Sequence, residues 1–95
     1  MFPVQILKQT NSKFYTGQGT AGVAAALTDR PETLKYGVYI RNHDALNPLY
    51  VGNSNVTDAN GFQVVAGDSI WIPVEDARTV YVVSGGAVDY SYLLV

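Results

Sequence analysis

Several short groups of residues have the types and spacing that binding or catalytic sites require. The segment GQGTAG at residues 17–22 fits G-x-G-x-x-G, in which glycines let a dinucleotide approach the backbone at the start of a helix. Such a site also needs that helix, a second parallel strand and an acidic residue about 20 positions further on. Asn42 and Asp44 stand at that distance, but in a turn-like stretch. We therefore predict a flexible loop at residues 17–22 and no cofactor.

His43 and Asp44 could supply a general base and the carboxylate that orients it. That chemistry also needs a nucleophile and an oxyanion site, and adjacent residues on an extended segment point in opposite directions. A second acidic pair, Glu75 and Asp76, is followed by Arg78 and suits a solvated corner. We therefore predict an exposed turn at His43, no catalytic residues and no enzymatic activity.

Metal ligands are sparse in this sequence. The segment DANG at residues 58–61 resembles part of a calcium loop, but it lacks the preceding alternating ligands and the closing glutamate. The chain has no cysteine and one histidine, so it cannot build a structural zinc site from these residues alone. We predict a turn at residues 58–61 and no bound metal.

Charge and hydropathy argue against two classes of partner. Six basic and eight acidic residues give a net charge of −2, and no basic cluster occurs that could contact phosphates. The longest apolar run, residues 21–27, is far shorter than the about 20 residues of a membrane span. Residues 1–4 lack the charged start of a signal peptide. We expect no nucleic-acid partner, no membrane contact, and synthesis in the cytoplasm.

Alternating apolar and polar residues, interrupted by Gly, Asn, Asp and Pro, are typical of a compact antiparallel β domain. We predict an all-β fold, a single-domain antiparallel β-sandwich or jelly-roll-like barrel of about eight short strands over residues 1–95. The first two and the last two expected strands would form hairpins. The strands are expected at residues 4–7, 13–16, 20–29, 36–42, 49–51, 62–65, 69–74, 79–83 and 88–95.

The alternation also assigns side chains to faces. Tyr39 and Arg41 are expected to point away from the core, and Trp71 likewise. Pro73 cannot donate a backbone hydrogen bond, so its strand should either lie at a sheet edge or end at this residue. The predicted core consists of Val38, Ile40, Leu49, Val51, Ile70, Ile72, Val80 and Val82.

Four sequence words occur in order: GVYIRN, LYVGNSNVT, NGFQVVAGDSIWIPV and TVYVV, at residues 37–42, 49–57, 60–74 and 79–83. Together they resemble small structural proteins of tailed-bacteriophage virions, including head-decoration proteins. The resemblance implies a non-enzymatic capsid decoration (cement) protein that binds the assembled shell of major capsid protein, or another virion protein, at the capsid surface. The alternatives are a tail, baseplate or head-fibre β module, and a lectin-like carbohydrate-binding module.

The chain is rich in aromatic residues, with seven Tyr, three Phe and one Trp. Aromatic side chains on outer faces can be ordinary strand residues, a platform for sugars, or the centre of a protein interface. We expect Phe2, Tyr39 and Trp71 to contact a partner, with residues 1–4 as an N-terminal arm. A core of this size gives a thin margin of stability, so we expect association with partners. With the resemblance to virion proteins, we also expect a homo-oligomer on the particle, with a trimer favoured.

Overall fold

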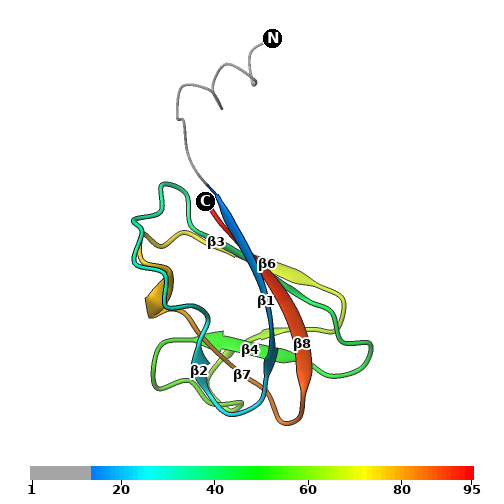
Figure 1. The fold of residues 1–95 in the computed structure, drawn as a ribbon. Helices are drawn as coiled ribbons and strands as arrows, with labels where there is room; N and C mark the ends of the chain where they lie inside the picture. The colour runs from blue at the N-terminus through cyan, green and yellow to red at the C-terminus, as the bar shows by residue number, and fades with distance from the viewer. Residues whose placement is uncertain (1–13) are drawn as a thin grey trace.

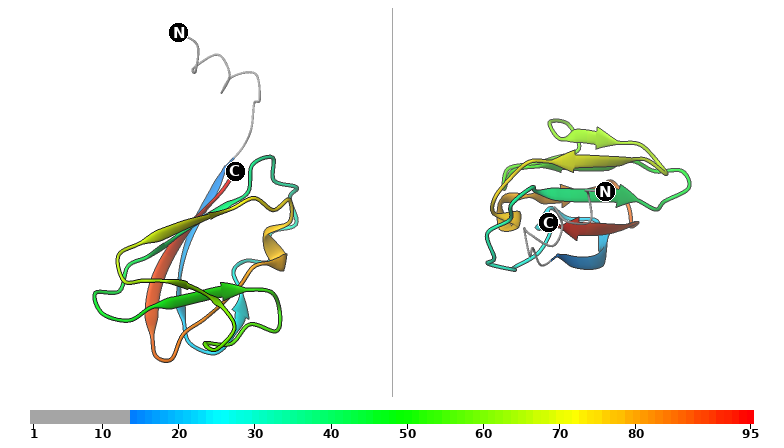
Figure 2. Two further views of the ribbon diagram at one scale, coloured as in Figure 1. Left: turned by 180° about the vertical axis from the view of Figure 1, so that it is seen from behind. Right: turned by 90° about the horizontal axis from the view of Figure 1, so that it is seen from above.

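The computed structural model describes residues 14–95 and shows two antiparallel sheets of four strands each, packed as a β-sandwich (Figures 1 and 2). Sheet A has the strand order β1-β8-β3-β6, and sheet B has the order β2-β7-β4-β5. The predicted β-sandwich is therefore confirmed. The elements are β1 (Tyr15–Ala21), β2 (Ala25–Ala26), β3 (Val38–Asn42), β4 (Leu49–Gly52), β5 (Phe62–Val64), β6 (Ser69–Ile72), the 3-10 turn η1 (Ala77–Thr79), β7 (Tyr81–Val83) and β8 (Val88–Leu94).

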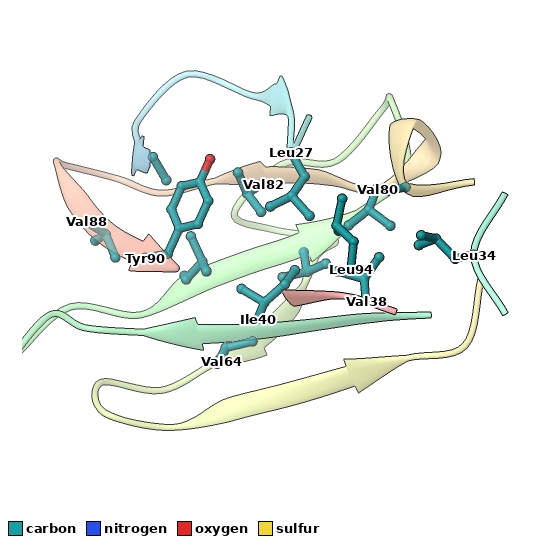
Figure 3. Close-up of a cluster of buried hydrophobic side chains, with 14 residues drawn as sticks. Leu27, Leu34, Val38, Ile40, Val64, Val80, Val82, Val88, Tyr90 and Leu94 are labelled. Atoms are coloured by element: carbon teal, nitrogen blue, oxygen red, sulfur yellow. The ribbon is translucent and has the colours of Figure 1, made fainter. Parts of the chain in front are cut away.

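The core lies between the two sheets, where apolar side chains from both inner faces meet (Figure 3). On β3, Val38 and Ile40 are buried while Tyr39 between them is exposed, so the predicted alternation is correct. Six of the eight predicted core residues are buried, namely Val38, Ile40, Leu49, Val51, Val80 and Val82. Ile70 and Ile72 pack against this cluster. They are only half-buried because β6 is an edge strand of sheet A.

The predicted flexible loop at residues 17–22 is wrong, because residues 17–21 belong to β1. This strand pairs with β8 along its whole length, so Gly17 lies opposite Tyr92 and Gly19 lies opposite Tyr90. A Cβ atom at position 17 would lie 2.3 Å from Cζ of Tyr92. The glycines thus make room for two tyrosine rings, as glycines in strands do where another group approaches closely.

Two further predictions need correction. The strand expected at residues 20–29 is limited to the end of β1 and the two residues of β2. The terminal hairpin does not form, since β7 pairs with β2 and β4 whereas β8 pairs with β1 and β3. Residues 84–87 instead carry the chain from one sheet to the other. The buried Ser84 hydroxyl lies at this crossing, 3.1 Å from the carbonyl oxygen of Ala21 and in contact with that of Gly86, and it can donate its single proton to either carbonyl.

Asn42 at the end of β3 is a fully buried polar residue that ties the two sheets together. Its Nδ2 donates to the carbonyl oxygens of Asn47 and of Val64 on β5, both at 3.0 Å. Its Oδ1 accepts from the backbone N–H of Asp44 at 2.8 Å. Because buried amides are stable only when their hydrogen bonds are made, this side chain holds the β3–β4 loop in one position.

Both edges of sheet A are formed by strands with a single neighbour, β1 and β6. The edge position of β6 was predicted from Pro73, and the strand ends directly before that residue. The expected strand at residues 4–7, residue 13 of the next strand and the candidate contact Phe2 lie outside the described residues. Within residues 14–95 there is no helix long and apolar enough to cross a membrane.

A candidate protein interface on sheet A

Tyr39 and Trp71 form an exposed aromatic pair on the outer surface of sheet A. They are register partners on β3 and β6, and their ring centroids are 6.2 Å apart with the ring planes at 43°. The Tyr39 hydroxyl lies 2.7 Å from Oγ of Ser69, which restricts the tyrosine ring. Tyr39 is 38% and Trp71 44% exposed. Each follows a residue that faces the core, so strand alternation points its side chain outward. The pair thus offers a large apolar area that nothing within the described chain covers.

Neighbouring strands extend this pair. Leu93 on β8 is the register partner of Tyr39 and is half-exposed. Two residues further along β3, Arg41 lies between Ser69 on β6 and Ser91 on β8 and is exposed. No carboxylate of residues 14–95 lies within salt-bridge distance of the Arg41 guanidinium. We call Tyr39, Trp71, Leu93 and Arg41 the aromatic face.

This composition is the one that protein interfaces favour. Tyr, Trp and Arg are the residue types most enriched among those that dominate binding energy, and apolar neighbours exclude water from them. The sequence pattern predicted that Tyr39 and Trp71 point outward. It also placed Arg41 on the same face of β3 as Tyr39. It could not identify Leu93, since the pairing of β3 with β8 brings residues 39 and 93 together.

A sugar platform fits the same residues less well. Stacking of a pyranose needs exposed rings that lie in one plane, with Asp or Asn side chains beside them to bind hydroxyls. The two rings are tilted by 43°, and the Tyr39 hydroxyl already contacts Ser69. The acidic residue on this surface, Asp89, accepts a hydrogen bond of 2.7 Å from the hydroxyl of Thr20 on β1.

His43 has a partner that sequence reasoning missed. Its Nε2 lies 2.7 Å from Oγ of Ser91, although 48 positions separate the two residues in sequence. Asp44 does not orient this histidine, because its Oδ2 accepts from the backbone N–H groups of Asn47 and Leu46. These two bonds hold the pKa of Asp44 below its ordinary value, and the bond from Asn47 has the larger effect.

A serine–histidine hydrogen bond alone does not make a hydrolytic site. In the described part of the chain both nearby carboxylates have other partners, Asp44 in its own loop and Asp89 on Thr20. The histidine is exposed and lines a shallow hollow together with Thr20 and Asp89. The bond joins Ser91 on β8 to the loop after β3, while both carboxylates bond elsewhere.

The remaining candidate motifs form turns. At residues 58–61, Asn60 Oδ1 accepts from the backbone N–H of Thr57 at 2.7 Å, which is the local bonding expected of a turn. At the acidic corner, Arg78 donates to Asp76 through two guanidinium N–H groups, each at 3.0 Å. The side-chain hydrogen bond from Arg78 is the main reason that the pKa of Asp76 is lowered. Both turns were predicted.

Comparisons with protein-family models, with curated proteins and with solved structures find no match to this chain.

Proposed function

We propose that this chain is a non-enzymatic structural protein of a tailed-phage virion. Its most specific form is a capsid decoration (cement) protein that attaches to the assembled coat through the aromatic face of sheet A. The virion context comes from the resemblance of residues 37–83 to such proteins. The attachment surface comes from one observation, the exposed Tyr39–Trp71 pair on the outer surface of a four-stranded sheet.

The geometry of the face suits a rigid partner. Tyr39 is held by Ser69, and both strands are paired within the sheet, so little side-chain freedom is lost when a partner covers the rings. The Arg41 guanidinium beside them can bind a carboxylate of the coat in bidentate geometry. A contact centred on these residues combines apolar area with one directional charge contact.

Binding to a lattice would also compensate for the small core. A ligand that binds only the folded state stabilises that state by mass action, and a coat shell presents its binding sites at fixed positions. One copy that contacts two coat subunits acts as a bivalent clamp, with an avidity above that of either contact alone. The gain in stability and avidity on a shell favours decoration over a freely diffusing role.

Two alternative functions would also use the aromatic face. A tail, baseplate or head-fibre module would use the same face on a different virion partner. A lectin-like module would need a sugar to bind the tilted rings, which their 43° angle disfavours.

Cross-linking mass spectrometry on intact particles that carry the chain separates these proposals. Decoration predicts cross-links from the lysines of this protein to the major capsid protein, at a copy number in proportion to coat subunits. Cross-links only to tail or fibre proteins would reject the capsid assignment. Absence of the chain from purified particles would reject the virion role.

A further inference from the structure

A second apolar feature lies at the open side of the sandwich, between the edge strands of the two sheets. It is a groove with a volume of about 490 Å³ between β6 and the β4–β5 pair. Phe62 on its wall is 62% exposed, and Ile70 and Ile72 on the other wall are only half-buried. We call it the edge groove. It is lined mainly by apolar residues: Val51, Phe62, Ile70, Trp71, Ile72, Pro73, Val74 and Val80.

The edge groove has the features of a site for an extended peptide. Strand β6 pairs with β3 on one side only. Its other side is open for a further strand, apart from the N–H of Ser69, which donates to Oδ1 of Asp68 at 2.8 Å. Strand addition supplies affinity through main-chain hydrogen bonds, and alternate side chains enter the pockets beside the edge. Here those side chains would pack against Phe62 and the half-buried residues of β6.

We propose that the edge groove binds the N-terminal segment of a second copy of this chain, through Val4-Gln5-Ile6-Leu7. The chain outside the described structure is 13 residues long, and residues 4–6 of it alternate apolar, polar and apolar, as a groove-bound strand requires. Val4 and Ile6 would point to the groove while Gln5 points to solvent. Pro3, which cannot donate to a ladder, precedes the segment and does not interrupt it.

The register of sheet A favours a second copy over the same chain. Tyr15 pairs with Leu94, and Leu94 pairs with Val38. Val38 pairs in turn with Ile72, so β1 begins in the same row as the end of β6. A strand added beyond β6 would lie four strand spacings, about 19 Å, from β1.

Residues 7 and 14 are seven residues apart, which allows at most about 25 Å at full extension. A self-bound segment would therefore need an almost straight connection around the end of the sheet. It would also run parallel to β6, because β1 starts at the row where β6 ends. A second copy has neither restriction and can pair in the more stable antiparallel direction. The exchange gives a closed pair or ring, and it does not depend on which particle carries the chain.

Cysteine cross-linking in the full chain tests this proposal, because the natural sequence has no cysteine. The double variant Ile6→Cys/Phe62→Cys should oxidise to species linked between copies, visible as multimers under non-reducing denaturing conditions. The matched control Ile6→Cys/Leu46→Cys places the second cysteine on another exposed apolar residue and should stay largely unlinked. A disulfide within single chains would show that the groove holds its own N-terminal segment and would overturn the proposal, as would no disulfide at all.

Sedimentation velocity gives an independent readout. The wild-type chain should self-associate with rising concentration, and Val4→Asp/Ile6→Asp should abolish this while Thr10→Asp does not. Circular dichroism checks that each variant keeps its β structure. A wild-type protein that remains monomeric over the whole accessible concentration range would contradict the exchange.

Discussion

Gly19 on β1 and Tyr90 on β8 are register partners that face each other inside the sandwich, at a separation that leaves no room for a side chain on residue 19. A Cβ atom there would lie 2.6 Å from the Tyr90 hydroxyl oxygen. Tyr90 is 7% exposed and belongs to the core cluster, so its ring has little space to move. Packing against β8 thus explains two glycines of the pattern that resembles a nucleotide motif, Gly17 and Gly19.

The first prediction concerns this contact. Gly19→Ala should lower the free energy of unfolding by about 1–3 kcal/mol, the usual cost of overpacking a core. Gly22→Ala is the matched control, because a Cβ at position 22 meets no atom within 4 Å. Urea denaturation measures both variants. Equal midpoints for the two variants would show that Tyr90 yields easily and that the glycine is not required there.

Alkaline pH should destabilise the protein through the same tyrosine. Burial, and then the neighbouring Tyr92, raise the pKa of Tyr90 above its ordinary value of 10.0. The folded state therefore binds this proton more tightly than the unfolded state does. The resulting stability is fully present below the pKa of the unfolded tyrosine and is lost as the pH rises through the raised pKa of the folded protein.

Tyr90→Phe removes the titrating group and should reduce the loss of stability as the pH rises from below 10.0, the ordinary pKa of tyrosine, to above it. Tyr36→Phe, at an exposed position, serves as the control. Urea denaturation at several pH values across this range measures the difference. If wild type and Tyr90→Phe lose stability in parallel, Tyr90 does not carry the alkaline dependence.

Asn42 provides a test of the polar link between the sheets. Asn42→Ala leaves the carbonyl oxygens of Asn47 and Val64 without their donor and should cost about 2 kcal/mol or more. Asn42→Asp keeps the shape but directs a carboxylate at the same carbonyls, which raises the pKa of the new group.

The deficit of Asn42→Asp relative to wild type should therefore shrink as the pH falls and the new carboxyl is protonated, since a protonated carboxyl can donate again. Thermal unfolding followed by circular dichroism at neutral and acidic pH would show this. A deficit that is the same at both pH values would mean that the Asn42 amide is not the group that joins the sheets.

Alternation along single strands was enough to predict the faces of the sheets. Val38 and Ile40 lie inside and Tyr39 outside, and Pro73 correctly marks β6 as an edge. These features depend on residues close in sequence, where a period of two follows directly from strand geometry. The candidate interface residues Tyr39 and Trp71 could be named for the same reason.

Features that depend on pairing between distant segments could not be predicted. The role of Gly17 and Gly19 requires knowledge that β8 lies beside β1. Likewise, the turn-like residues between β7 and β8 suggested a hairpin, but they connect two different sheets. The hydrogen bond of His43 with Ser91 and the burial of Asn42 also arise only when strands from distant parts of the chain pair.

The attachment of folded variants to particles that lack this chain tests the central claim most directly. Trp71→Ala and Tyr39→Ala should both keep the fold, and each should weaken attachment by about 2 kcal/mol or more, roughly 30-fold in affinity. Trp71 also lines the edge groove, but Tyr39 does not. A loss of attachment in Tyr39→Ala therefore reports on the aromatic face and not on self-association through the groove. Leu46→Ala, at an exposed apolar residue of the β3–β4 loop, controls for a general loss of surface area. We predict reduced occupancy for the two aromatic variants and wild-type occupancy for Leu46→Ala; wild-type occupancy by folded Trp71→Ala and Tyr39→Ala would contradict the proposed interface.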